Sequence, residues 1–537
     1  MTPAPLPADE ARGRLVRSAS LITVMTLLSR VTGYVRNMAI AAFFGAGRSS
    51  DVFWAAFRIP NIFRQLVAEG ALPGVFIPSY AERRRRDGEE AAPVFVGRIL
   101  SALTFLVSGI TVLGIVFAPA IVRLLARGFA ETPGKLEMTV YLTRLMFPYL
   151  CFISVAALMQ AILNAHGRFA VSALSPILLN LAIVAAATLL APRMEEPTVA
   201  LAIGVLVGGV LQMLIQLPAV LSLRAIARPR LDFSDPAVRG VFLLLIPRLF
   251  GFGIYAINIA LSTRFASVYG DGAVSYLTYA NQVVELVRGG FVISVATAIL
   301  PLLSQQALEE DRRPLKGTLR FGLRMVAFVT VPWAVGLIVL REPLIRLLFE
   351  HGRFGPLDTA VTAHVLSLYA LGLVFVSSNN LLVGAHYARK DTRTPVICAA
   401  LDLAVFVTVA LALRSSGFGL GSVALATSCG AAVNCLLLAT FLRRQEGLLG
   451  GREIAGSILR ILTAAAAMGA AVWWVAFRVL LEPPGAGVGA EILRVALLAL
   501  AGAAVYLGTA LLVRSSEPAE FIRLLRRRVP VAPPPSP

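Results

Sequence analysis

Long apolar segments recur along the whole chain, and short stretches rich in glycine, proline and charged residues separate them. The apolar runs are continuous and do not alternate with polar residues, which favours membrane-spanning helices over the strands of a membrane barrel. The pattern predicts an all-α polytopic membrane protein. It places about fourteen transmembrane helices near residues 19–44, 52–78, 94–125, 138–164, 172–191, 198–223, 238–267, 274–304, 317–341, 359–387, 395–414, 419–442, 455–481 and 488–513.

Composition supports this class. Soluble domains are about 45–50% apolar and about 25% charged. This chain of 537 residues is 57% hydrophobic and 15% charged, with a mean hydropathy of +0.79. The formal net charge of +19 would suggest a nucleic-acid partner in a soluble protein. Here the basic residues concentrate in alternate loops, so the positive-inside rule accounts for the charge and no nucleic acid is expected.

The basic loops also predict the orientation. Lysine and arginine are abundant in segments 12–17, 83–86, 224–230, 312–320, 389–393, 443–452 and 514–528, and sparse in the alternate loops. This asymmetry places both termini in the cytoplasm, which agrees with an even number of spans. The N-terminus lacks a short apolar core followed by a small-residue cleavage site, so residues 1–18 are expected to be a retained cytoplasmic tail.

Two six-helix lobes are predicted from a weak internal repeat. Residues 28–34 resemble residues 246–252, residues 76–78 resemble 299–301, and Ala165-His166 resembles Ala385-His386. The matches keep their order at an offset of six spans, so the halves share one orientation and are expected to be related by an axis along the membrane normal. We predict an N-lobe at 19–223, a C-lobe at 238–442, two further helices at 455–513 and a cytoplasmic tail at 514–537.

Arginines lie inside the first two predicted spans, Arg30 and Arg36 in the first and Arg64 in the second. At a rise of ~1.5 Å per residue across a core of ~30 Å, Arg30 and Arg64 fall near mid-membrane. An arginine there costs roughly 2.5–3.5 kcal/mol on insertion scales, so it should face water, a partner or an anionic ligand. Guanidinium is planar and can bind phosphate oxygens in pairs, so we predict a substrate site for a diphosphate or polycarboxylate.

The alternative is that the arginines pair with Asp51 and Glu69 and only stabilise packing. Two carboxylates cannot neutralise all of the arginines of these spans, because Arg58 lies there as well. Arg58 is nearer the outer surface, where it could also extend its charge to the interface. Asp51 follows a Gly-Ala-Gly turn and is either a gate partner for an arginine or an N-cap of the second span.

Further cavity candidates lie in the seventh, eighth and eleventh spans. The seventh carries Arg264 and also Arg248, which matches Arg30 in the repeat. In the eighth, Gln282 is polar, and Glu285 and Arg288 are spaced to pair on one helix face. That pair is either structural or part of the cavity. In the eleventh, Asp402 is a candidate cation or proton site.

Neither catalysis nor a structural metal is predicted. The four cysteines lie inside apolar segments without metal-ligand spacing, and the histidines show no paired spacing. No phosphate-binding loop of the ATPase type, HExxH or GxSxG motif is present. We therefore expect no enzyme activity and no cofactor. Transport would then use the membrane potential, a monovalent cation or the gradient of the substrate.

The first two spans read SRVTGYVRN at 29–37 and GAGRSSDVFWAAFRIPNIFRQLVAEGALPGVFIP at 45–78. This stretch resembles the MurJ/MviN family of lipid II flippases, within the multidrug/oligosaccharidyl-lipid/polysaccharide exporter superfamily. The resemblance continues through FPYLCFISVAALMQAILNAHGRF at 147–169, GGVLQMLIQLP at 208–218 and LFEHGRF at 348–354. It covers essentially the whole chain.

The resemblance implies fourteen helices in the bacterial inner membrane, with two six-helix lobes around a cationic cavity and a groove for the polyprenyl tail at the last two helices. By position, the cavity arginines of the family match Arg30, Arg36 and Arg64, its outer acidic residue matches Asp51, and its second-span glutamate matches Glu69. The implied activity is movement of lipid II to the periplasmic leaflet by alternating access. Membrane lipids and other cell-wall synthesis proteins are implied partners.

Two departures from the family pattern stand out. Asn37 occupies a position that is often acidic, and the eighth span reads Tyr279-Ala280-Asn281-Gln282 where an arginine is common at the last position. We hypothesise that Arg264 or Arg288 supplies the missing charge. The departures leave two alternatives open: a flippase for another polyprenyl-diphosphate-linked saccharide, and a non-transporting flippase-like scaffold. A drug antiporter is disfavoured because the predicted cavity is basic, and a diphosphate-processing enzyme because no carboxylate cluster is visible.

Overall fold

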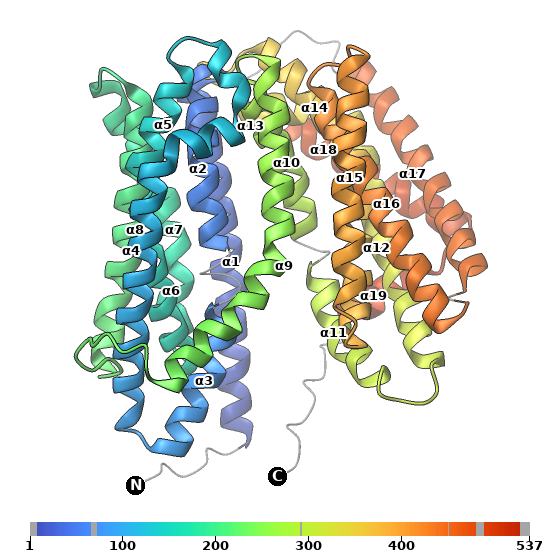
Figure 1. Ribbon diagram of the computed structural model, residues 1–537. Coiled ribbons are helices and arrows are strands. Elements are labelled where there is room, and N and C mark those ends of the chain that lie inside the picture. Colours follow the sequence, from blue (N-terminus) through green and yellow to red (C-terminus); the bar gives the residue numbers. More distant parts are fainter. Residues whose placement is uncertain (1–7, 66–71, 290–292, 449, 480–487, 527–537) are drawn as a thin grey trace. The chain divides into compact units, whose positions relative to one another are not determined.

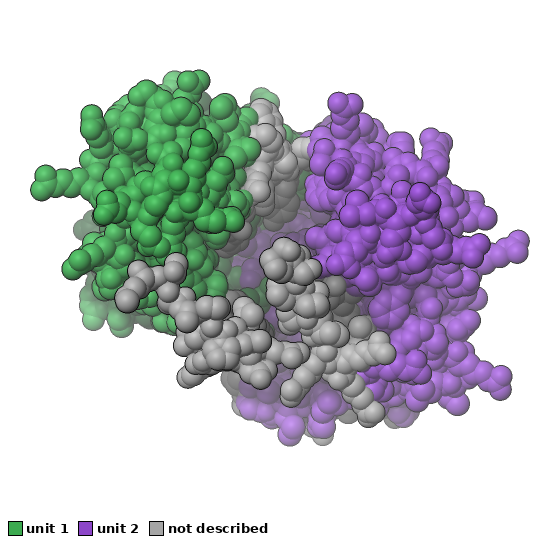
Figure 2. Space-filling view, turned by 90° about the horizontal axis from the view of Figure 1, so that it is seen from below, with its two compact units in different colours: residues 1–275, 351–355 green, residues 276–350, 356–537 purple. Residues whose placement is uncertain are grey.

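The computed structural model describes residues 8–65, 72–289, 293–448, 450–479 and 488–526, and some side chains within these helices, including that of Arg248, lie outside the description. The described residues form helices and connecting turns without a β-strand (Figure 1). They divide into two compact units, coloured separately in Figure 2. Unit 1 comprises residues 1–275 and 351–355, and unit 2 comprises residues 276–350 and 356–537.

Unit 1 is built from nine helices of the described chain: α1 (Ala8–Phe44), α2 (Arg48–Arg64), α3 (Leu72–Asp87), α4 (Ala91–Leu125), α5 (Lys135–Met146), α6 (Tyr149–Ala165), α7 (Phe169–Ala185), α8 (Pro197–Ser222) and α9 (Pro236–Ala266). Short helical segments lie at Arg127–Glu131, Ala186–Leu190, Ala191–Arg193 and Ser267–Tyr269. Helix α7 packs on α1 and α8, and α2 packs on α5. The contacts of α9 are with α2, α3 and α4 of this unit.

Unit 2 contains most of α10 (Ala273–Val287) and the helices that follow it: α11 (Ile293–Gln306), α12 (Arg313–Val339), α13 (Arg341–Phe349), α14 (Pro356–Ala388), α15 (Arg393–Ser415), α16 (Gly421–Glu446), α17 (Gly451–Val479), α18 (Val488–Leu512) and α19 (Glu517–Arg526). Helix α14 packs on α12 and α16, and α17 packs on α12 and α18.

Close packing of small residues holds the apolar helices together. A Cβ atom at Gly208 of α8 would lie 2.9 Å from the Cα atom of Leu179 in α7. At Gly372 of α14, a Cβ atom would lie 2.9 Å from the Cα atom of Ser428 in α16. Neither position leaves room for a side chain. Such backbone approaches are typical of helix association in membranes, where apolar burial alone provides little drive.

Ten helical stretches of the described residues are long and apolar enough to cross a membrane. They correspond to the predicted third to sixth and ninth to fourteenth spans. Large apolar side chains on α4 remain exposed, including Phe105, Val112, Leu113, Val116 and Phe117. This is the surface that lipid would cover, since monomeric soluble proteins rarely expose so large an apolar patch.

The predicted first, second, seventh and eighth spans are not among these ten. The second contains α2 and α3, with residues 66–71 between them outside the description, and the eighth contains α10 and α11, with residues 290–292 outside it. All four carry the arginines or polar residues noted in the sequence. Their status as spans therefore stays a prediction. The fourth predicted span is also two helices, because Pro148 lacks the N–H that a continuous helix would use.

Helix α19 lies within the segment predicted from sequence only as a tail. Its first residue, Glu517, is buried against α12 and α17. The carboxylate accepts hydrogen bonds from Arg324 Nε at 2.7 Å and from the hydroxyls of Ser457 and Ser515. Phe521 packs against Phe328 of α12, with ring centroids 6.0 Å apart. The helix is therefore docked by ion pairs of Glu517 and Glu520 with Arg324 and by an aromatic contact.

Acid is expected to loosen this docking. Burial alone would raise the pKa of Glu517, but hydrogen bonds from Ser457, Ser515 and Arg324 outweigh burial and lower the pKa to about 2. Because the folded value lies below the ordinary value of 4.5, ionised Glu517 stabilises docking above pH 4.5, and this contribution is lost as the pH falls towards 2. The mobility of a spin label at Ile522, which is exposed, should rise across that window.

The matched variants are Glu517→Gln and Glu520→Gln. The first should give a mobile label that no longer responds to pH in this window. The second should behave like the wild type, because Glu520 is only partly buried and meets Arg324 at 3.4 Å. An unchanged pH response in Glu517→Gln would contradict the assignment.

Candidate functional site

Arg36 of α1 is fixed by two amide side chains. Its Nε and Nη2 atoms donate to Oδ1 of the adjacent Asn37 at 3.0 and 2.9 Å, and Nη1 donates to Oδ1 of Asn180 in α7 at 3.0 Å. The guanidinium carbon lies 5.8 Å from the ring centroid of Trp54 in α2, within the range of a cation–π contact. Three helices of unit 1 thus position one cation.

Arg64, near the end of α2, belongs to the same electrostatic environment, since its charge acts repulsively on Arg36. Its Nε donates to Oδ1 of Asn61 at 3.2 Å. Arg30 is half-buried on α1 and makes no hydrogen bond or ion pair with any residue that the structure describes. Arg58 is half-buried on α2. Glu69 falls outside the described residues.

Neither Arg30 nor Arg36 makes an ion pair with a residue that the structure describes. Asp51, the carboxylate that the sequence offered as a partner for them, is engaged elsewhere. The packing interpretation therefore has no counterion for Arg30 or Arg36 among the described residues. A guanidinium without a counterion attracts an anion, and phosphate oxygens suit its donor geometry.

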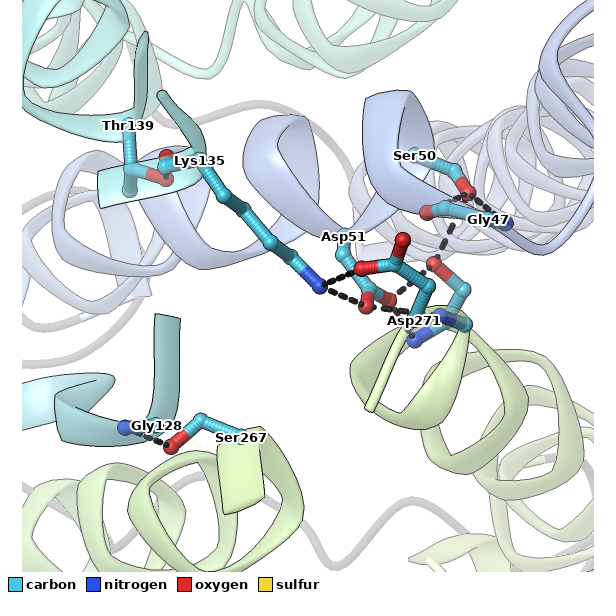
Figure 3. A network of polar contacts seen from close by, with 10 residues as sticks. Gly47, Ser50, Asp51, Gly128, Lys135, Thr139, Ser267 and Asp271 are labelled. Carbon is cyan, nitrogen blue, oxygen red and sulfur yellow. Dashed lines mark hydrogen bonds and ion pairs between the residues drawn. The ribbon is translucent and has the colours of Figure 1, made fainter. Parts of the chain in front are cut away.

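Asp51 is the centre of a buried polar network at the start of α2 (Figure 3). Lys135 Nζ lies 2.9 Å from Oδ2 of Asp51 and 2.7 Å from Oδ1 of Asp271. The backbone N–H of Gly272 donates to Oδ2 at 2.8 Å, and both the N–H and the hydroxyl of Ser275 donate to Oδ1 at 2.9 and 2.8 Å. Asp51 and Lys135 are almost completely buried, with 0% and 1% of the side chains exposed.

This geometry corrects one sequence interpretation. Asp51 was offered as an N-cap of the second span, but the N-cap of α2 is Gly47, whose N–H donates to Ser50 Oγ at 3.0 Å. Asp51 instead accepts from the backbone at the beginning of α10. The carboxylate therefore ties α2 to α5 through Lys135 and to residues 271–275.

Lys135 and Asn180 were missed by reasoning from the sequence. Lys135 falls in one of the alternate loops that are poor in basic residues, and a Pro-Gly turn directly before the lysine was a usable sign. Asn180 is an isolated amide within an apolar run, and such a residue in a spanning helix often has a specific partner. In both cases the partner is distant along the chain, so the sequence could not identify it.

The seventh-span arginines differ in what the structure shows. Arg264 Nη1 donates to the backbone carbonyl of Leu124 at 2.7 Å, which satisfies a carbonyl at the C-terminus of α4. That contact is a helix cap. The side chain of Arg248 lies outside the description. The hypothesis that Arg264 supplies a cavity charge therefore receives no support from its contacts.

In unit 2, Arg288 Nη2 lies 2.9 Å from Oε2 of Glu285, as the spacing of the two residues predicts. Both side chains are about two-thirds to three-quarters buried, and Gln282 lies half-buried one turn earlier on α10. The pair neutralises itself, which weakens the hypothesis that Arg288 replaces the missing charge. Its part in substrate binding stays a prediction.

Asp402 of α15 packs against Gly430 of α16, where a Cβ atom would lie 2.1 Å from Oδ1. The carboxylate makes no hydrogen bond or ion pair with another described residue. No group of three or more His, Cys, Asp or Glu side chains that could hold a metal ion occurs in the described ranges. A cation site at Asp402 stays a prediction.

Comparisons with known proteins agree over most of the chain. The family model described as "Lipid II flippase MurJ" matches residues 40–482. The "Probable lipid II flippase MurJ" of Vibrio cholerae is 36% identical over 468 residues, covering 86% of this chain and 89% of that protein. The "Lipid II flippase MurJ" of Burkholderia cenocepacia is 34% identical over 439 residues, covering 80% and 84%.

Solved structures also match the chain over most of its length. "Lipid II flippase MurJ, inward closed conformation" matches with a TM-score of 0.75 and 26% identity, over 94% of this chain and all of that one. An inward-facing multidrug resistance MATE family transporter of the MOP superfamily matches with a TM-score of 0.65 and 15% identity over 80% of this chain, which shows the fold alone. The chain belongs to the MurJ family of lipid II flippases.

Proposed function

We propose that this protein moves lipid II from the cytoplasmic to the periplasmic leaflet of the bacterial inner membrane, as a step in peptidoglycan synthesis. Two independent observations support the proposal. The family relationship extends over most of the chain, and Arg36 of α1 is held by two neutral amides and has no ion pair with a described residue. The second observation is the one that carries the chemistry, because lipid II presents a diphosphate.

In this proposal, Arg30, Arg36 and Arg64 bind the diphosphate of the head group. Each guanidinium can donate two parallel hydrogen bonds to phosphate oxygens. The bound anion offsets the repulsion between the arginines, so α1 and α2 are more stable with substrate than without it. A ligand shifts a conformational equilibrium by its differential affinity for the two states, and this difference is the source of substrate-driven alternating access.

The Asp51 network is proposed to hold the outer end of α2 closed. It joins α2 to α5 and to residues 271–275 through buried contacts that must break together if these segments separate. A network in which every lone pair is satisfied rigidifies its surroundings. Its opening would release substrate to the outer leaflet, with no covalent step.

Several finer features belong to the same proposal. They are fourteen spans with both termini in the cytoplasm, two lobes of six helices, and a polyprenyl-tail groove at α17 and α18. Energy would come from the membrane potential or a monovalent cation, for which Asp402 is the candidate site. Membrane lipids and other cell-wall synthesis proteins are the proposed further partners.

The direct test is rescue of a bacterium depleted of its own lipid II flippase. Expression of the wild-type chain, with membrane insertion verified, is expected to restore growth and the appearance of lipid II at the outer leaflet. Inserted protein that restores neither would contradict the proposal. Restoration of a different lipid-linked saccharide pathway would favour the alternative substrate, and restoration of none would favour a scaffold.

A further inference from the structure

Residues 351–355 overlap the segment LFEHGRF and are bound to the end of α1. They belong to unit 1, whereas α13 before them and α14 after them belong to unit 2. The backbone N–H of Arg353 donates to the carbonyl of Ala42 at 2.8 Å. Ala42 lies in the last turn of α1, where carbonyls lack a partner within the helix. The segment therefore caps the helix that carries Arg36.

Two glycines allow the two backbones to approach this closely. A Cβ atom at Gly352 would overlap the carbonyl oxygen of Ala42. One at Gly45 would lie 2.9 Å from the carbonyl oxygen of Arg353. Both glycines have a positive φ, +60° at Gly352 and +67° at Gly45, which other residues disfavour. Phe354 is only 1% exposed, so the contact joins backbone to backbone and is anchored by a buried aromatic ring.

The base of the segment is fixed within unit 2. The hydroxyl of Thr359, in the first turn of α14, donates to Oε2 of Glu350 at 2.6 Å. Glu350 directly follows α13, and its Oε2 atom lies 3.5 Å from Nε of Arg346 in that helix. The ends of α13 and α14 are therefore joined, and a displacement of residues 351–355 must move these ends or strain the connection.

Arg36 has its own supports elsewhere in unit 1. Asn180 of α7 accepts from its guanidinium, and the ring of Trp54 in α2 lies beside it. Binding of an anion to Arg36 therefore does not need the contact at Ala42. A helix is a rigid element that can carry a displacement from one site to another, so a shift of α1 on anion binding would reach residues 351–355.

We propose that residues 351–355 are a permanent clasp between α1 and the joined ends of α13 and α14, through which anion binding at the arginines of α1 is passed to unit 2. Identification of the anion as the diphosphate of lipid II rests on the proposed function. The clasp stays closed, in contrast to the charged network of Asp51, which is proposed to open. Breaking the clasp leaves the anion bound but removes its effect on unit 2.

The test measures diphosphate binding and its effect on α14 in the full-length protein in lipid nanodiscs. The probe is inorganic diphosphate. The reporter is an environment-sensitive dye on Leu357→Cys, a position that is 75% exposed in the first turn of α14, with the four native cysteines replaced by alanine. In this parent protein, diphosphate is expected to change the dye signal. Gly352→Ala should bind diphosphate with unchanged affinity but lose the dye response.

Two pairs of variants separate the clasp from general destabilisation. Gly355→Ala is the control for Gly352→Ala, because a Cβ atom there would meet no atom of a neighbouring residue within 4 Å. Thr359→Val removes the hydroxyl that fixes the base and should also lose the response, which keeps the test possible if Gly352→Ala does not fold. Its control is Thr362→Val, at a buried position of α14 whose hydroxyl has no hydrogen-bond partner among the described residues. Both controls should respond like the parent protein.

Cross-linking tests whether the clasp is permanent. A short bifunctional maleimide should join Ala42→Cys to Arg353→Cys to the same extent with and without diphosphate. Arg353 is exposed and uses its backbone for the hydrogen bond, so the substitution leaves the contact in place. A contact that opened on anion binding would give a lower yield in the presence of diphosphate.

The outcomes distinguish this inference from the proposed function. A dye response that persists in both Gly352→Ala and Thr359→Val overturns the inference and leaves the flippase proposal standing, as does loss of diphosphate binding in both variants or a cross-linking yield that depends on diphosphate. Loss of the response in both variants with normal controls supports the inference. If the wild type then fails to rescue a flippase-depleted strain, lipid II is removed as the ligand. A parent protein that does not bind diphosphate, or binds it without a dye response, overturns the inference, and rescue alone decides the function.

Discussion

Replacement of Lys135 by methionine is expected to lower the free energy of unfolding by about 3–5 kcal/mol, the usual range when one member of a buried ion pair is removed. Lys135 and Asp51 are almost completely buried, and Lys135 also contacts Asp271. Without the ammonium group, Asp51 keeps its hydrogen bonds from Gly272 and Ser275 but becomes a buried charge without a counterion. Thermal or denaturant unfolding in detergent measures the change.

The double variant Lys135→Met/Asp51→Asn should recover much of this loss, because replacing both charges avoids the unpaired carboxylate. Lys316→Met is the matched control, since Lys316 is half-buried at the start of α12 and has no ion pair with a described residue. If Lys135→Met lowers the free energy of unfolding no more than this control does, the ion pair makes no net contribution to stability. In the proposed function this network closes the outer side, so the double variant should open there more readily. A cysteine placed at position 271 should then be more accessible than in the wild type.

Replacement of Arg36 or Arg64 by glutamine is expected to abolish rescue of a flippase-depleted strain and to raise the dissociation constant for lipid II roughly 10- to 100-fold. This range corresponds to the ~1.5–3 kcal/mol of a hydrogen bond to a charged group. Arg36 is held by neutral amides, and the charge of Arg64 acts on it. Their effects should therefore be non-additive in the double variant.

The control for the arginine variants is Arg123→Gln, which makes the same change of charge at an exposed position of α4. It should insert, bind lipid II and rescue growth like the wild type. Unimpaired lipid II binding by both Arg36→Gln and Arg64→Gln would remove the arginines from the binding site, while leaving the family assignment unaffected.

The helical membrane class and most of the helix positions could be predicted from the sequence. Continuous apolar runs define ten of the predicted spans because each run must satisfy its own backbone hydrogen bonds within the bilayer. The least predictable helix was α19. It occupies part of a predicted tail, because docking by Glu517 depends on Arg324, which is distant along the chain.

For the candidate site as well, part could be predicted from the sequence and part came only from the structure. The sequence by itself showed that arginines lie inside predicted spanning segments and need a polar partner there, because an arginine in an apolar run is costly wherever the chain folds. Only the tertiary structure decided which partners they have. Asn37 and Asn180 accept hydrogen bonds from Arg36. Arg288 pairs with Glu285, and Arg264 donates to the backbone carbonyl of Leu124. The structure also decided that Asp51 joins Lys135. Hydrogen bonds and ion pairs act over a few ångströms between groups far apart in sequence, so a linear pattern can show that a charge needs a partner but cannot show which partner the fold supplies.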